Sequence, residues 1–160
     1  MPPTGRRRQQ GAAAFIDVVE HPRRALWRIP PDPIQLQVIL GSLLGDGRLV
    51  GAEGQRRLRI AHEPKRADYV RWKYQRLGAF AGDAPRHAGG HLTFETVAHP
   101  VFEDLAPFFY RPDGARHVRR EDVLRLVRPL GLAVWLTDLG RIELHAEAFL
   151  PEQRRLALAS

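Results

Sequence analysis

Two apolar helices that contain small residues limit most strongly what this chain can fold into. Residues 34–44 carry apolar side chains almost all round the predicted helix, which indicates a buried helix and not a surface one. Gly41 and Ser42 lie within it, and their small side chains allow another helix to come close. Residues 130–139 repeat the pattern, with Gly131 and Ala133 as the small residues. The sequence therefore predicts two buried helices of the same kind.

The ends of these helices are marked in the sequence. Asp32 is a candidate N-cap of the first helix, and Pro33 stands at the first helical position, where its missing N–H group costs nothing. The helix is expected to end at Gly45-Asp46-Gly47, because glycine tolerates the backbone conformations of a helix stop. The second helix ends in a similar way, at Asp138-Leu139-Gly140.

The segments between the two helices alternate between strands and helices. Turn residues and hydrophobic periodicity predict strands at 48–52, 55–62, 84–88 and 91–96, and helices at 64–80, 99–109 and 119–127. A strand at 141–146 and a helix at 151–159 are expected after the second buried helix. This order indicates an incomplete internal repeat and an α+β fold. We divide the chain into a basic extension (1–33), a first half (34–128), and a second helix with an incomplete second half (129–160).

The strand at 55–62 has one apolar and one basic face. Arg57, Arg59 and Ala61 alternate with Leu58 and Ile60. A sheet that lies on DNA would need such an arginine face, but the same alternation is typical of an ordinary half-solvated hairpin.

Composition narrows the partners. The net charge is +7, and 23 of the 25 basic residues are arginine. The guanidinium group binds phosphate in a bidentate manner, so nucleic acid is the leading partner, although GC-rich codon usage also inflates arginine. The chain has no cysteine, which excludes disulfides and cysteine-bound metals, and no apolar stretch long enough for a membrane span. We expect a cytoplasmic protein.

The segment 39–47, Ile-Leu-Gly-Ser-Leu-Leu-Gly-Asp-Gly, resembles the LAGLIDADG motif of homing endonucleases. Residues 129–140 look like the second copy in the two-motif branch of that family, residues 141–146 resemble the strand after it, and residues 69–74 resemble the helix after the first hairpin. The resemblance covers about residues 34–159. It implies an α+β fold with an αββαββα half, a buried motif helix, a DNA-binding saddle of antiparallel strands, and a partial second half. The two motif helices of the family pack side by side.

The resemblance also implies an activity, which is Mg²⁺-dependent cleavage of double-stranded DNA at a specific site, in the service of intron or intein mobility. The family places a metal-binding acid at the foot of each motif helix. Asp46 takes the first position, with Gly45 as a further expected metal ligand beside it, but Leu139 stands where the second acid is expected. Asp138 would have to replace it, and its side chain is expected to point elsewhere, because consecutive helical residues are about 100° apart.

Two main functions stay open on the sequence. The first is an endonuclease in which Asp46 and Asp138 are the catalytic and metal-binding acids. The second is a DNA-binding protein, such as a regulator, that has lost cleavage, and a protein–protein module is a third reading. Homodimerisation could supply a second saddle, but the second motif helix would compete for the same interface. The expected DNA contacts are Arg48, Arg56, Arg57, Arg59, Lys65, Arg116, Arg119, Arg120 and Arg141.

Overall fold

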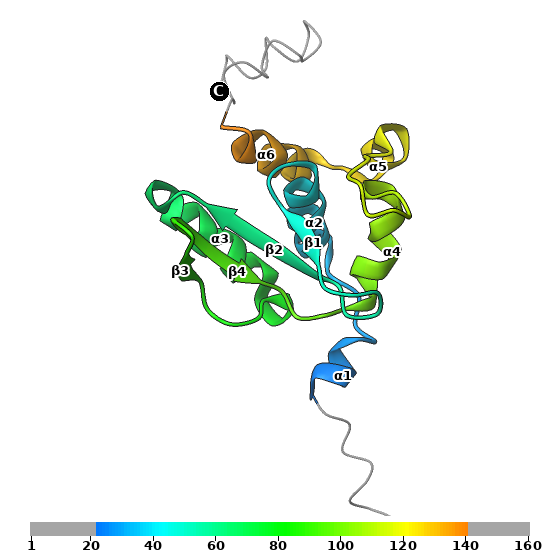
Figure 1. Cartoon of the computed structure of the whole chain (residues 1–160), viewed down its shortest axis with the longest axis horizontal. Coiled ribbons are helices and arrows are strands. Elements are labelled where there is room, and N and C mark those ends of the chain that lie inside the picture. Colours follow the sequence, from blue (N-terminus) through cyan, green and yellow to red (C-terminus); the bar gives the residue numbers. More distant parts are fainter. Residues whose placement is uncertain (1–21, 141–160) are drawn as a thin grey trace, which may run out of the picture.

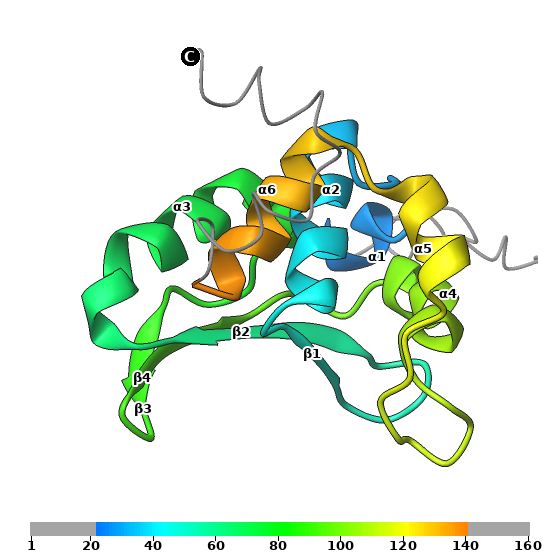
Figure 2. The same cartoon turned by 90° about the horizontal axis from the view of Figure 1, so that it is seen from above.

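A four-stranded antiparallel sheet forms the base of the molecule, and the helices lie on one side of it (Figures 1 and 2). The computed structural model describes residues 22–140. The strands are β1 (Arg48–Val50), β2 (Arg57–His62), β3 (Arg86–Ala88) and β4 (His91–Glu95), in the order β1-β2-β4-β3. This mixture of helices and antiparallel strands confirms the α+β prediction.

Helices α2 (Pro33–Leu44) and α6 (Pro129–Asp138) pack side by side over the sheet, as Figure 2 shows. A Cβ atom added at Gly41 would lie 2.4 Å from the carbonyl oxygen of Gly131, so only glycine allows the two backbones to approach this closely. Asp32 caps α2 as predicted, since its side chain accepts a hydrogen bond from the backbone N–H of Gln35. The two buried helices predicted from the sequence are therefore confirmed.

The remaining helices surround this pair. They are α1 (Pro22–Leu26), α3 (Ala67–Leu77), α4 (Pro100–Phe109) and α5 (Arg120–Leu126). The helix expected at 64–80 is divided: short 3₁₀ turns at Pro64–Arg66 and Gly78–Phe80 flank α3. Gly78 has a φ of +53°, a left-handed conformation that ends the α-helix. The strands are also shorter than expected, because the β1–β2 connection takes residues from both predicted strands.

The sheet has one apolar and one polar face, as the alternation in the sequence predicts. Leu58 and Ile60 of β2 and Leu92 and Phe94 of β4 are buried under the helices and belong to the core. The intervening residues Arg57, Arg59, Thr93 and Glu95 are only partly buried or exposed. Within residues 22–140, the helices of the layer above the sheet therefore leave its opposite face uncovered.

The predicted extension (1–33) is described only from residue 22. The indole of Trp27 donates a hydrogen bond to the carbonyl of Ala98 (2.8 Å), and the His99 ring bonds the carbonyls of Leu26 and Ile29 (both 3.1 Å). These contacts fasten the end of the extension to the main body. The expected strand 141–146, the helix 151–159 and Arg141 lie outside the described residues. No helix within 22–140 is long and apolar enough to cross a membrane.

Candidate functional site

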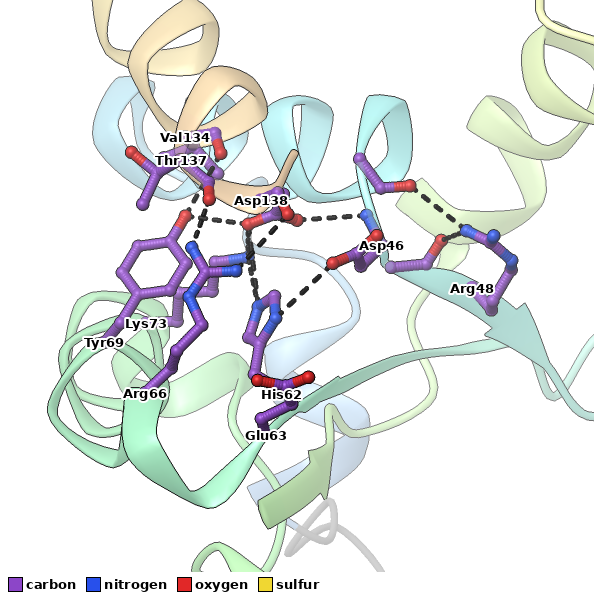
Figure 3. Close-up of polar contacts among 12 residues, drawn as sticks. Asp46, Arg48, His62, Glu63, Arg66, Tyr69, Lys73, Val134, Thr137 and Asp138 are labelled. Atoms are coloured by element: carbon purple, nitrogen blue, oxygen red, sulfur yellow. Dashed lines mark hydrogen bonds and ion pairs between the residues drawn. The ribbon is translucent and has the colours of Figure 1, made fainter. Parts of the chain in front are cut away.

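The ends of α2 and α6 bring Asp46 and Asp138 together (Figure 3). The backbone N–H of Asp46 donates a hydrogen bond to Asp138 Oδ2 at 3.1 Å. The side chain of Asp138 is fully buried, whereas that of Asp46 is 49% exposed. The expectation that Asp138 points elsewhere was wrong, because its carboxylate lies against the first motif.

The register of α6 explains this placement. Gly131, Val134 and Asp138 are buried and follow the i, i+3, i+7 spacing of one helix face, whereas Leu139 is 38% exposed. Gly45 makes room for the carboxylate, since a Cβ atom there would lie 2.4 Å from the Cβ of Asp138. The position that the family pattern assigns to a ligand thus faces outward in this chain, and its neighbour faces inward.

Two side chains of α3 hold the Asp138 carboxylate. Lys73 Nζ lies 2.5 Å from Asp138 Oδ1, and the Tyr69 hydroxyl donates to the same oxygen at 2.8 Å. Burial lowers the pKa of Lys73, while the Asp138 charge acts in the opposite direction. Burial, assisted by the Asp138 charge, raises the pKa of Tyr69, which therefore stays a hydroxyl donor. The carboxylate is thus bound to a buried ammonium group.

The His62 ring lies between the two carboxylates. Its Nδ1 is 3.5 Å from Asp46 Oδ2, and its Nε2 is 3.6 Å from Asp138 Oδ1. Burial and the Lys73 charge lower the pKa of His62 to about 4, so the ring is neutral at pH 7. Burial and the Asp138 charge raise the pKa of Asp46. The side chain of Asp46 nevertheless reaches a surface pocket lined also by His62, Glu63, Lys65 and Arg66.

Arginines cap the C-terminal ends of both motif helices. Arg116 donates to the carbonyls of Leu43, Gly45 and Gly47 at the end of α2, and Arg48 donates to those of Gly45 and Gly47. Arg66 donates to the carbonyls of Thr137 and Asp138 at the end of α6. The last carbonyl groups of a helix have no partner within the helix and carry partial negative charge, so a positively charged side chain there is stabilising. The Gly45 carbonyl, a predicted metal ligand, therefore accepts bonds from two guanidinium groups.

The open face of the sheet carries a cluster of arginines. Glu95 of β4 accepts a hydrogen bond from Arg57 Nε on Oε2 (2.9 Å) and one from Arg59 Nη2 on Oε1 (2.7 Å). Arg86 of β3 pairs in register with Thr93, so it belongs to the same face. These side chains line an open groove along the sheet together with His91. Sequence reasoning missed Arg86 and His91, which the alternation of the second hairpin could have assigned to this face.

The other predicted DNA contacts are distributed differently. Arg56 is paired with Glu103 of α4, Lys65 with Glu63, and Arg119 with Asp122. Arg120 is exposed at the start of α5. Their role toward DNA stays a prediction, as does that of Arg141.

Three members of the carboxylate cluster went unassigned in the sequence. They are His62, Tyr69 and Lys73, none of which the motif or the charge pattern assigns to a site. A signal was present, because His62 continues the buried alternation of Leu58 and Ile60, and Tyr69 and Lys73 are four residues apart on one helix face. Only the tertiary packing, which brings β2 and α3 to the end of α6, shows that they meet Asp138.

Comparison with known proteins identifies the family. The model of the LAGLIDADG DNA endonuclease family matches residues 36–155. The chain belongs to this family. Its fold is similar to that of a solved structure, the homing endonuclease I-WcaI bound to its DNA recognition sequence. That match has a TM-score of 0.61 at 17% identity and covers 77% of this chain and 61% of the other.

The curated proteins that this chain resembles in sequence are much longer than the chain itself. The protein RecA of Mycolicibacterium chitae is 36% identical over 109 residues, which are 66% of this chain and 26% of that protein. The protein RecA of Mycobacterium shimoidei is 33% identical over 115 residues, or 70% and 27%. The chain therefore spans about a quarter of the length of these relatives.

The LAGLIDADG pattern implies Mg²⁺ between the two acids, and the residues present do not fit a shared ion. Asp138 Oδ1 already accepts bonds from Lys73 and Tyr69, and Oδ2 accepts the Asp46 N–H. Within residues 22–140, no three His, Asp or Glu side chains are arranged to hold a metal ion. Of the two acids, only Asp46 keeps an accessible carboxylate.

Proposed function

We propose that this protein binds double-stranded DNA in a sequence-specific manner across the open face of its sheet. The observation that carries the proposal is the arginine cluster of Arg57, Arg59 and Arg86 on the face that the helices leave uncovered. Guanidinium groups bind phosphates and the base edges of guanine in the major groove. Membership of the LAGLIDADG DNA endonuclease family and the DNA-bound state of the structural relative support the same partner.

The pairing with Glu95 supports a defined mode of binding. One carboxylate bonds both Arg57 and Arg59, so it orients two flexible side chains before DNA arrives. Ordering a long side chain on binding costs about 0.5–1.5 kcal/mol, and an oriented guanidinium avoids part of that cost. The charge of Glu95 also disfavours non-specific contact with phosphate, which leaves discrimination to the bases.

Cleavage is the second candidate function, and the geometry supports it less. Asp46, at the pocket beside the open face, is the acid best placed to hold Mg²⁺, which would polarise the scissile phosphate and activate water when bound. A two-acid site would also require Asp138, whose carboxylate is bound to Lys73. We therefore propose that the protein binds double-stranded DNA with weak or absent double-strand cleavage. A role in intron or intein mobility requires cleavage and depends on the outcome of the cleavage experiment below.

A binding experiment tests the proposed partner. The affinity for duplex DNA, measured by fluorescence anisotropy, should fall linearly with salt on logarithmic axes, because phosphate contacts release counterions. Replacing both Arg59 and Arg86 by alanine should weaken binding about tenfold or more and reduce the slope by about 1–2. The control is Arg71→Ala on α3, which removes a charge from an exposed residue on the helix side of the sheet. An affinity that does not change with salt would exclude DNA binding through phosphate contacts. Equal losses of affinity in the Arg59/Arg86 double variant and in Arg71→Ala would exclude the open face of the sheet as the DNA-binding surface.

A second experiment separates binding from cleavage. Supercoiled plasmids carrying candidate target sites are incubated with Mg²⁺ or Mn²⁺, and linear and nicked products are counted. We expect little linear DNA from the unmodified protein. Efficient linearisation that Asp46→Asn abolishes would instead assign double-strand cleavage to this chain.

A further inference from the structure

The most unusual charge in the structure is the ammonium group of Lys73. Its side chain is fully buried, and so is that of its partner Asp138. Nζ lies 2.5 Å from Asp138 Oδ1, 3.3 Å from His62 Nε2 and 4.6 Å from the centre of the Tyr69 ring. Because an unpaired buried charge is costly, a buried lysine survives only with such partners.

The ammonium group lies at the end of α6, next to the point where the two motif helices meet. Asp46 and Asp138 converge there, and the Asp138 charge, together with burial, raises the pKa of Asp46. Lys73 supplies positive charge from a third element, α3. Oδ1 of Asp138 accepts bonds from Lys73 and Tyr69, and Oδ2 accepts the backbone N–H of Asp46, so the buried carboxylate is already neutralised by a cation of the protein itself.

We propose that the Lys73 ammonium replaces a divalent cation at the junction of the two motif helices. The buried Asp138–Lys73 pair joins α6 to α3, and the Asp138–Asp46 hydrogen bond joins α6 to the end of α2. The junction is thereby complete without metal. It becomes a site for a divalent cation such as Mn²⁺ only when the lysine is removed, with oxygen ligands from Asp138 and a neighbouring nitrogen ligand from His62.

The test is thermal unfolding of the full chain without DNA, so its result is independent of the proposed DNA-binding function. Melting temperatures are compared in EDTA, Mg²⁺ and Mn²⁺ at constant ionic strength. The unmodified protein should shift by less than about 1 °C between these conditions. Lys73→Ala should melt lower in EDTA and rise by about 5 °C or more with Mn²⁺, because a ligand that binds only the folded state stabilises it.

The chain offers a matched control for the lysine. Lys65 is the only other lysine, and its side chain is 77% exposed and paired with the exposed Glu63. Lys65→Ala should behave like the unmodified protein in all three conditions. The double variant Lys73→Ala/Asp138→Asn should lose the rise with Mn²⁺, since the carboxylate that holds the ion is gone.

Two outcomes would overturn the proposal. One is a clear Mn²⁺ or Mg²⁺ stabilisation of the unmodified protein that Asp138→Asn removes, which would mean that Asp138 binds metal in the presence of Lys73. The other is a folded Lys73→Ala protein that does not respond to Mn²⁺. If Lys73→Ala does not fold, Lys73→Met keeps most of the side-chain volume, and equilibrium dialysis of Mn²⁺ against the unmodified protein and Asp138→Asn measures the first outcome directly.

Discussion

At the scale of single residues, burial as well as residue type determines which side chains around Asp46 and Asp138 are charged. Asp46 and Asp138 are both aspartates at the ends of equivalent helices, yet one is half exposed and the other fully buried. The buried one is bound by a lysine, a tyrosine and a backbone N–H group, as a carboxylate removed from water requires. His62 between them is neutral because its surroundings are buried and already contain the Lys73 charge.

The lowered pKa of His62 predicts a pH-dependent stability. Below pH 6.5 the unfolded chain protonates His62, whereas the folded protein does so only near pH 4, so stability should fall as the pH drops from 6.5 to 4. The loss attributable to His62 should reach at most about 3.5 kcal/mol, at about 1.4 kcal/mol per pKa unit. Urea denaturation of the unmodified protein and of His62→Gln across this range measures it as a difference.

The exposed His87 of β3 provides the control, and His87→Gln should keep the pH profile of the unmodified protein. The raised pKa of Asp46 has the opposite effect on stability, because it favours the folded state as the pH falls. Asp46 is present in both the unmodified protein and His62→Gln, so the comparison isolates His62. A His62→Gln profile that parallels the unmodified one would show that the ring is not held neutral.

At the scale of elements, the contact between α2 and α6 depends on two glycines that are not equivalent. A Cβ atom at Gly41 would meet the Gly131 carbonyl oxygen at 2.4 Å and the Val134 Cβ at 2.6 Å, which belong to the facing helix. A Cβ atom at Gly131 would meet mainly the Oε1 atom of Gln37 at 2.5 Å, the end of a side chain that can rotate. Gln37 nevertheless has a role, since its Oε1 accepts the backbone N–H of Arg128 at the start of α6.

The same substitution should therefore have different effects in the two helices. Alanine gains about 1 kcal/mol of helix propensity over glycine, but overpacking a rigid contact costs about 1–3 kcal/mol or more. Gly41→Ala should destabilise the protein by about 2 kcal/mol, whereas Gly131→Ala should cost less, because Gln37 can move aside. Denaturant midpoints of the two variants test this order, and equal losses would contradict the asymmetric contact.

At the scale of the whole molecule, α6 covers the apolar surface of α2 that a second copy of the chain would otherwise use. Val38, Ile39, Leu40 and Leu43 are fully buried within the single chain. A homodimer through this surface would first have to displace α6. Among the described residues, the side without helices is instead the far face of the sheet (Figure 2), and Arg57, Arg59 and Arg86 line the groove on that face.

Shortening the chain tests this account of α6. A chain that ends at residue 128 exposes the apolar face of α2, and we expect it to lose cooperative unfolding and to bind a hydrophobic dye such as ANS. A chain that ends at residue 140 should unfold cooperatively, because it retains all the described contacts of α2 with α6. Cooperative unfolding of the chain ending at 128 would show that α6 is dispensable.

Much of the fold could be predicted because local patterns determine it. Examples are the capping residue Asp32, the small residues of the two apolar helices and the alternation of β2. Each is a property of a short segment, and the structure confirms the helix or strand that each one predicts. Element ends were less well predicted, as at Gly78, where a single backbone conformation divides a periodic segment. The i, i+3, i+7 spacing of Gly131, Val134 and Asp138 also predicts that the Asp138 side chain points toward α2. The family pattern instead assigns the ligand position to Leu139.

The sequence by itself determined the α+β class, the two buried helices, the family and the arginine face of β2. Only the tertiary structure decided which charges neutralise one another, because pairing depends on contacts between segments far apart in the chain. It placed Lys73 of α3 on Asp138 of α6, and Arg116 on the end of α2. In a region of low dielectric, such a pair determines whether an aspartate is free to act as a ligand, and no spacing within one segment contains that information.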